Sequence, residues 1–272
     1  MRTGDANGAQ RRVCLLTGAG GTLGDAFCRT FADRYDIVAV CGRRAPTVPS
    51  QEADFVDPLA PASAVAENAK RVYTVHADLA RDGECERVVE LALARHGQVD
   101  LLVNAAAYSF WPSAGLADGE AGLASFDQHF GMNVGVPLRL AVRLAQRCWR
   151  DDEPTNRARN RNVVNVSSLA GSRVFPVNGQ GVYAASKAAL NQLTRYLAAE
   201  FATFGVRVNG VAPNSFPGIV ATDAVAGAIA RLDASDVHGR ILALDGPDQQ
   251  AGAGGAAGPA ADGRSGDPAP AR

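Results

Sequence analysis

A glycine-rich turn near the amino terminus constrains the fold more than any other stretch of this chain. The apolar run from Val13 to Thr17 predicts a short strand, and the pattern that follows to about Arg34 predicts a helix. Between them lies the loop Gly18-Ala19-Gly20-Gly21-Thr22-Leu23-Gly24. A strand, a glycine loop and a helix in this order point backbone N–H groups and a helix N-terminus at a phosphate. The sequence therefore predicts dinucleotide binding at this turn.

The rest of the chain alternates strands with helices. Further strands are predicted at Ile37–Cys41, Arg71–Val75, Asp100–Val103, Asn162–Val166, Val206–Val211 and Arg240–Leu244, and helices at Glu84–His96, Leu123–Trp149, Tyr183–Phe204 and Ala221–Leu232. Such an alternation, joined by right-handed crossovers, gives a doubly wound parallel sheet with helices on both faces. We therefore expect one α/β domain over residues 12–246, with about seven parallel strands.

Four segments lack helix or strand periodicity. Residues 1–11 are polar and residues 247–272 are rich in Gly, Ala and Pro, so both are predicted to be disordered tails. Prolines punctuate residues 45–69, where we expect mostly loop with a short helix near Ala62–Asn68. The polar, charged stretch Asp151–Asn162 is predicted to be a surface loop.

A tyrosine and a lysine stand four residues apart at the start of the predicted helix 183–204. Residues with this spacing share one helix face, so Tyr183 and Lys187 point the same way. Of the 27 basic residues only Lys70 and Lys187 are lysine, and lysine supplies a compact charge that arginine does not. A nearby cation lowers the pKa of a phenol from its usual value of about 10, which suits general acid–base catalysis. We interpret the pair as a proton-transfer device; decoration of a helix surface is the alternative.

The end of the second strand bears on the choice of dinucleotide. It leads into Gly42-Arg43-Arg44, and no acid occurs between Asp36 and Glu52. A protein that binds NAD usually holds the ribose diol with an acid here, whereas arginine accommodates the 2′-phosphate of NADP. The sequence favours NADP(H) held by Arg43 and Arg44, with solvated surface arginines as the alternative.

Other candidate residues follow the carboxyl ends of predicted strands, where open α/β sheets bind their ligands. Asp78 and Leu79 follow the strand 71–75 and are expected beside an adenine. The run Asn104-Ala105-Ala106-Ala107 would let the backbone approach a cofactor, because its alanines are small. Ser167 and Ser168 end the strand 162–166. We expect all of these at one edge of the sheet.

Aromatic residues occur in the segments that follow three of these strands. They are Phe110, Trp111, Phe175 and Phe216. An apolar wall for a bulky substrate and ordinary core packing are both open interpretations of these side chains.

Composition excludes several classes of function. The chain has 272 residues of which 47% are hydrophobic, enough for one good core. A net charge of −1 argues against a nucleic-acid partner. No apolar run approaches the roughly 18 residues of a membrane-spanning helix, so no membrane partner is expected. The five cysteines are scattered and have no metal-ligand spacing, so we expect no metal and a cytoplasmic location.

Taken together, these motifs resemble the short-chain dehydrogenases/reductases. Thr17-Gly18 with Gly21 and Gly24, Asn104-Ala105-Ala106, Asn133, Ser168 and Tyr183-x-x-x-Lys187 occur in that family's order, and residues 239–246 resemble its last strand. The similarity covers about residues 12–246 and implies a Rossmann-like fold. It also implies a homodimer or homotetramer formed through the helices at 123–149 and 183–204.

The resemblance assigns roles to individual residues. Tyr183 would be the catalytic acid/base, Lys187 would lower its pKa, Ser168 would hold the substrate carbonyl and Asn133 would support a proton-relay water. The cofactor would contact Thr17, Gly18, Gly21, Thr22, Leu23, Gly24, Arg43, Arg44, Asp78, Leu79, Asn104, Ala105, Ala106, Tyr183, Lys187 and Pro213. The implied activity is NADPH-dependent reduction of the carbonyl of a small molecule.

The sequence departs from the family pattern in its glycine loop. The loop reads TGxxGxxG, with Thr22 where the commoner TGxxxGxG pattern has glycine. That form is more usual in members that act on nucleotide sugars, often epimerases or dehydratases, which carry a larger C-terminal region than this chain. A dinucleotide-binding sensor or scaffold without turnover is a further alternative.

Two departures concern the substrate side. Ser168 lies 15 residues before Tyr183 where about 13 is common, so we assign it over Ser167 and Ser172 from its SxxG context and infer a short insertion. Pro213 has the family context but precedes Asn214, while the letters of PGxxxT fit Pro217-Gly218 and Thr222. Little room remains for a substrate-covering loop, so the site is either open or closed by residues 108–111, by the insertion after Ser168 or by a partner subunit.

Overall fold

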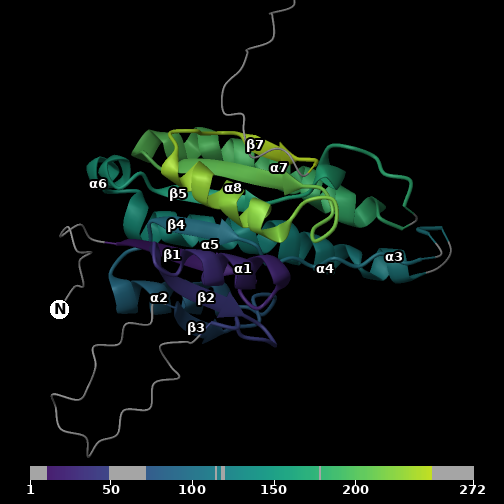
Figure 1. The fold of residues 1–272 in the computed structure, drawn as a ribbon, viewed down its shortest axis with the longest axis horizontal. Helices are drawn as coiled ribbons and strands as arrows, with labels where there is room; N and C mark the ends of the chain where they lie inside the picture. The colour runs from purple at the N-terminus through teal and green to yellow at the C-terminus, as the bar shows by residue number, and fades with distance from the viewer. Residues whose placement is uncertain (1–10, 49–71, 114, 118–119, 178, 247–272) are drawn as a thin grey trace, which may run out of the picture.

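A single parallel sheet organises the molecule. The computed structural model describes residues 11–48, 72–113, 115–117, 120–177 and 179–246, which Figure 1 shows as a ribbon. Within these residues seven strands form one sheet, in the order β3-β2-β1-β4-β5-β6-β7. The strands are β1 (Arg12–Thr17), β2 (Tyr35–Cys41), β3 (Val72–His76), β4 (Leu101–Asn104), β5 (Asn162–Val166), β6 (Arg207–Pro213) and β7 (Ile241–Leu244). The predicted doubly wound sheet is confirmed.

Helices cover both faces of the sheet. They are α1 (Thr22–Phe31), α2 (Glu84–His96), α3 (Glu120–Ala124), α4 (Phe126–Phe130), α5 (Val136–Leu144), α6 (Glu153–Ala158), α7 (Gly181–Phe201) and α8 (Thr222–Ala234). Helices α1 and α8 pack on one face, and α2, α5 and α7 pack on the other. The π-helical turns η3 (Gly131–Gly135) and η4 (Ala145–Trp149) and the short 3-10 turns η5 (Leu169–Gly171) and η6 (Ala202–Phe204) complete the regular structure.

Each central strand contributes side chains to two hydrophobic cores, one on each face of the sheet. Successive side chains of a strand point to opposite faces, so Leu16 packs beneath α1 and α8, whereas its neighbour Leu15 packs beneath α2 and α5. Both side chains are fully buried, and burial of one such side chain contributes about 1.5–3 kcal/mol. Burial on both faces explains why these strands are continuous apolar runs rather than alternating ones.

The stretch expected to be a surface loop contains a helix. Helix α6 begins after Asp152, whose side chain accepts a hydrogen bond from the Thr155 backbone N–H. Pro154 occupies its first turn, a position where a missing N–H costs nothing. Six residues are too few to show a helical period, so the loop prediction over residues 151–162 was wrong. The capping aspartate and the proline were the signal that could have found it.

The long helix expected over residues 123–149 is also not uniform. The chain follows a helical path from α4 to η4, but residues 131–135 and 145–149 form π-helical turns. The first of these turns contains Asn133. Such turns frequently mark functional positions, because the extra residue reorients the side chains around it.

Several expectations lie outside the described residues. They are residues 1–10 and 247–272 of the predicted disordered tails, and most of the loop at 45–69, including the helix near Ala62–Asn68. Arg11, which was predicted to lie in the first tail, is buried and donates to the Ala32 carbonyl. In the part that the structure describes, no helix is both long enough and apolar enough to cross a membrane.

The strand order fixes where a ligand can bind. The chain starts at β1 in the middle of the sheet, moves outward to β2 and β3, and then returns to β4 on the other side of β1. The reversal places the carboxyl ends of β1 and β4 side by side, with Thr17 opposite Asn104 and Asn104 opposite Asn165. In Figure 1, α3 and α4 lie at this end of the sheet and α6 at the opposite end. A crevice at such a reversal is the usual binding site of an open α/β sheet.

Candidate functional site

The turn after β1 forms a cradle of backbone groups. Gly18 has a φ of +70°, and a Cβ there would lie 2.7 Å from the Ala106 backbone nitrogen. A Cβ on Gly24 would overlap the Gly18 carbonyl, so the start of α1 packs directly on the turn. Gly21 precedes α1, and no side chain caps its first N–H groups. Uncapped N–H groups at a helix N-terminus fit an anion, so these residues fit the pyrophosphate of a dinucleotide.

Thr17 holds the two central strand ends together. Its buried Oγ1 accepts hydrogen bonds from the Ala105 and Ala106 backbone N–H groups, both at 3.1 Å. On the neighbouring strand Asn104 Nδ2 donates to Asn165 Oδ1 at 2.8 Å, and Asn104 Oδ1 is buried without a partner among the described residues. The side chain of Thr17 therefore holds the backbone after β4 against the end of β1, and that of Asn104 links β4 to β5.

The two arginines after β2 lie beside this cradle. Arg43 and Arg44 are exposed, and a Cβ on Gly20 would overlap the Arg44 carbonyl. The segment that carries the arginines is thus packed against the glycine loop, a close approach that the sequence analysis did not find. The Asp25 carboxylate fixes this segment by accepting a hydrogen bond from the Thr47 backbone N–H at 2.6 Å.

The other residues expected at the cofactor are divided between surface and core. Asp78 is exposed and accepts a hydrogen bond from the Ala80 backbone N–H at 3.2 Å. Leu79 packs in the core beside α2, and Leu23, a buried residue of α1, packs in the core on the other face of the sheet. Thr22 is exposed at the start of α1, and Pro213 is buried at the end of β6.

Ser168, Tyr183 and Lys187 meet at the carboxyl end of β5. Tyr183 and Lys187 lie on the first turns of α7, and Lys187 Nζ is 5.8 Å from the centre of the Tyr183 ring. The Ser168 side chain lies where its hydrogen-bonding capacity lowers the pKa of the Tyr183 phenol, whereas Ser167 donates to the Lys187 carbonyl and Ser172 to the Leu169 carbonyl. Of the three candidate serines, Ser168 is the one that the structure places at the phenol.

The direction of the tyrosine pKa differs from expectation. Burial raises the pKa of the Tyr183 phenol, and the hydrogen bond with Ser168 offsets part of the rise. Burial also lowers the pKa of Lys187 to about 8, while its Nζ donates to the Val166 carbonyl at 2.9 Å. The expected lowering of the phenol pKa by the nearby cation is therefore wrong for this structure. Loss of water around the phenol is the larger of the two causes that act on its pKa.

Asn133 joins the catalytic candidates to the segment after β4. Its Oδ1 accepts from the Tyr108 backbone N–H at 2.8 Å, and its Nδ2 donates to the Tyr108 carbonyl and to Ser186 Oγ, each at 2.9 Å. Ser186 Oγ in turn donates to the Tyr183 carbonyl at 2.7 Å. Both amide hydrogens of Asn133 are used, so the expected relay water would have to bond to another atom.

His129 was missed by the sequence analysis. It lies one helical turn before Asn133 and therefore on the same face of the helix, a spacing that could have identified it. The ring is fully buried, 4.8 Å from the Tyr108 ring and 6.2 Å from the Tyr183 ring. Its Nδ1 lies 2.8 Å from the Ser125 carbonyl, so that nitrogen carries the hydrogen.

The segments after β4 and β5 cover the phenol. The Trp111 ring lies 5.5 Å from the Tyr183 ring. A Cβ on Gly179 would overlap the Pro112 carbonyl, so the two segments pack against each other without a gap. Of the closures that the sequence left open, residues 108–111 bring Trp111 against the phenol ring, and the insertion after Ser168 packs against the same segment at Pro112. Phe216, by contrast, packs against the core beneath α1 and α8.

The amino-acid sequence of this chain is similar to those of one protein family. Residues 12–231 match the sequence profile of the family described as short chain dehydrogenase. The 2-(R)-hydroxypropyl-CoM dehydrogenase of Xanthobacter autotrophicus is 28% identical over 233 residues, covering 85% of this chain and 82% of that protein.

Two solved structures with bound dinucleotides are similar. A short-chain dehydrogenase/reductase family oxidoreductase from Brucella ovis, in complex with a partially ordered NAD, is 27% identical with a TM-score of 0.61, covering 87% of this chain and 100% of that chain. A blue fluorescent protein from a metagenomic library, in complex with NADPH, is 23% identical with a TM-score of 0.65, covering 88% and 98%. The second likeness concerns the fold alone.

Substitution of Gly18 tests the cradle. Gly18→Ala should destabilise the protein by about 1–3 kcal/mol, because a non-glycine residue is strained at positive φ and its Cβ would press on the Ala106 nitrogen. Urea unfolding measures the loss. Gly42→Ala is the matched control, since a Cβ there meets no atom within 4 Å, and its stability should change by less than about 0.5 kcal/mol. Equal losses in the two variants would contradict the close approach.

The buried lysine predicts a pH dependence of stability. The Lys187 pKa falls from its ordinary 10.5 to about 8, so the unfolded chain binds more protons between these values and stability rises with pH across that window. Lys187→Met removes the buried charge and should stabilise the protein by about 2 kcal/mol at pH 7, after allowance for the lost bond to Val166. The difference should shrink between pH 8 and 10.5. A variant less stable than wild type throughout pH 6–11 would contradict the assignment; unfolding at a series of pH values measures it.

Proposed function

The chain belongs to the short-chain dehydrogenase/reductase family, and on that premise we propose that it is an NADP(H)-dependent oxidoreductase that reduces the carbonyl of a small molecule to an alcohol. One observation carries the proposal. Ser168, Tyr183 and Lys187 converge at the carboxyl edge of the sheet, next to a glycine cradle that fits a pyrophosphate. A protein that only bound the dinucleotide would need the cradle but not the acid–base group.

The proposed reaction divides its two transfers between cofactor and protein. The bound dinucleotide would supply the hydride that forms the new C–H bond. Tyr183 holds at its Oη the proton that forms the O–H bond, and Ser168 donates a hydrogen bond to the same carbonyl oxygen as negative charge develops there. Lys187 faces the phenol and stabilises the phenolate left after proton transfer.

The raised pKa of Tyr183 suits an acid. A phenol whose pKa lies above its ordinary value carries its proton at neutral pH, as reduction of a carbonyl requires. Lys187 keeps most of its positive charge at pH 7, because its pKa is about 8. The pair therefore starts the cycle as neutral phenol and ammonium, which favours the direction of reduction.

The preference for NADP(H) rests on the chain's own residues. The similar solved structures include one with NAD and one with NADPH, so likeness does not decide the cofactor. Two exposed arginines, Arg43 and Arg44, stand beside the glycine loop, where the 2′-phosphate of NADP would lie. A guanidinium is well suited to bidentate contact with such a phosphate.

Self-association and a cytoplasmic location complete the proposal. Leu123, Phe126, Leu138 and Tyr196 are exposed apolar side chains on α3, α4, α5 and α7. Such a set on neighbouring helices favours an interface between copies of the chain. All five cysteines are free, which suits a reducing compartment.

Removal of the phenol hydroxyl tests the catalytic assignment. Tyr183→Phe should lower kcat by about 10²–10⁴-fold, the usual contribution of a general acid. The affinity for NADPH, measured by fluorescence titration, should stay within about twofold because the ring remains. Retained turnover in the variant would exclude the role. NADPH binding by the wild type without turnover of any ketone in a broad panel would favour a sensor instead.

Reversal of charge after β2 tests the cofactor assignment. Arg43→Asp should weaken NADPH binding by about 10- to 100-fold, because a hydrogen bond to a charged group contributes about 1.5–3 kcal/mol, and NADH binding should be unchanged or improved. Arg150→Asp is the matched control, since Arg150 is exposed and its ion-pair partner is the exposed Asp151. An Arg43→Asp variant that keeps the wild-type preference would rule out the 2′-phosphate contact.

A further inference from the structure

We propose that the substrate of this site is an uncharged ketone bearing an aromatic or alicyclic ring, which lies against Trp111. This inference rests on the proposed function and names the substrate class of the same site. Three properties of the segments that cover Tyr183 support it: their exposed apolar side chains, their lack of free charge and their rigid packing.

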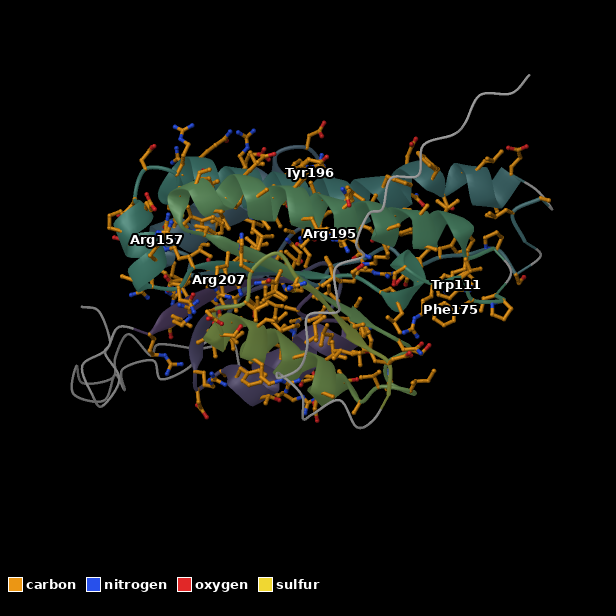
Figure 2. The ribbon with its side chains drawn as sticks, turned by 90° about the horizontal axis from the view of Figure 1, so that it is seen from above. Trp111, Arg157, Phe175, Arg195, Tyr196 and Arg207 are labelled. Carbon is orange, nitrogen blue, oxygen red and sulfur yellow. The ribbon has the colours of Figure 1, made fainter. Side chains whose placement is uncertain are left out.

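Five apolar residues on the segments after β4 and β5 make up what we call the apolar rim. They are Phe110, Trp111, Val174, Phe175 and Val177. Four of them are exposed, with exposed fractions of 42% for Phe110, 38% for Trp111, 100% for Val174 and 47% for Val177. Scattered exposed apolar residues are normal, but a group of them on two segments, one member of which lies against Tyr183, favours a ligand surface. Figure 2 shows Trp111 and Phe175 at one end of the molecule, far from Arg157.

Trp111 connects the rim to the reacting group. Its ring centre lies 5.5 Å from that of Tyr183, and the two ring planes are tilted by 54°. The rings therefore form two sides of a corner, with the phenol on one side and an accessible indole on the other. A ketone bound at the Tyr183 hydroxyl has the indole beside it for one of its substituents, and an aromatic or alicyclic ring there buries most apolar area.

The surrounding segments offer no free charge. In a chain of which 20% is charged, residues 105–117, 172–182 and 214–220 contain one charged residue, Arg173. Arg173 forms an ion pair with Asp245, which also accepts a hydrogen bond from Asn214 at 2.8 Å. The buried Lys187 faces Tyr183 and the Val166 carbonyl instead. A substrate carboxylate or phosphate would lose water here without gaining a cation, which is costly.

Hydrogen bonds and close packing fix the segments after β4 and β5 in the absence of substrate. Asn133 binds both backbone polar groups of Tyr108. Pro112 is in contact with Gly179, and a Cβ on Gly181 would lie 2.8 Å from the Leu116 side chain. A wall fixed at three points loses little conformational freedom on binding, which favours affinity for a rigid apolar ring.

A matched pair of ketones tests the absence of charge. 4-Methylacetophenone and 4-acetylbenzoate share a ring and a reacting carbonyl but differ in one carboxylate. With NADPH, kcat/KM for the neutral ketone should exceed that for the carboxylate by about 100-fold, since an unpaired charge is rejected strongly. Equal values, or a preference for 4-acetylbenzoate that disappears in Arg173→Gln, would overturn the proposal.

Variants of Trp111 test the ring contact. Trp111→Ala should raise KM for 4-methylacetophenone about tenfold or more with little change in kcat, whereas Trp111→Phe should restore most of the loss. Acetone, which has no ring, should show no such rise, and NADPH affinity should be unchanged in both variants. An equal rise of KM for acetone and the ring ketone would assign Trp111 a merely structural role.

Binding measured without turnover separates this inference from the proposed function. The chain has two tryptophans, and Trp149 is fully buried with its Nε1 donating to the Val99 carbonyl at 2.9 Å, so it gives a constant background. 4-Methylacetophenone should quench the fluorescence of the wild type but not of Trp111→Phe, and 4-acetylbenzoate should quench neither. Quenching without turnover would refute the reductase and keep the binding site. Turnover of both ketones alike would keep the reductase and refute the substrate class, and absence of both quenching and turnover would refute both.

Discussion

The close approach of two backbone segments, the turn after β1 and the start of the segment after β4, is the constraint on which the rest of the site depends. Gly18 has no room for a Cβ beside Ala106, and Thr17 Oγ1 holds the N–H groups of Ala105 and Ala106. This junction exists because the strand order reverses between β1 and β4. It places the phosphate cradle and the wall of the substrate side within one continuous surface.

Burial of Tyr183 and Lys187 costs free energy, because the charged form of each group loses its contact with water. Lys187 is buried and its pKa falls to about 8, while burial raises the pKa of Tyr183. Each change disfavours the charged form of its group, so the resting site is less polar than two solvated side chains would be. That cost is the reason such groups are useful: a phenolate formed during reaction meets a cation that is already in place and poorly screened by water.

The two sides of the site are built from different parts of the fold. In the proposed reaction the turns after β1 and β2 would form the cofactor side, with a glycine cradle and exposed arginines. The segments after β4 and β5 would form the substrate side, which is aromatic and nearly free of charge. Asn133 acts within the second of these sides, because it binds the backbone of Tyr108 and, through Ser186, that of Tyr183. Cofactor and substrate preference can therefore change independently of each other.

The amino-acid sequence by itself determined the seven strands, most of the helices and the order of the motifs. Apolar runs, helical periods and the glycine loop are local patterns, and they sufficed for the parallel sheet and for the shared face of Tyr183 and Lys187. Tertiary structure alone decided which aromatic residues cover the phenol, that Phe216 packs in the core, that His129 lies behind Tyr183 and in which direction the tyrosine pKa moves. These properties depend on burial and on contacts between segments far apart in the chain, and removal of water by a distant segment leaves no mark in the local sequence.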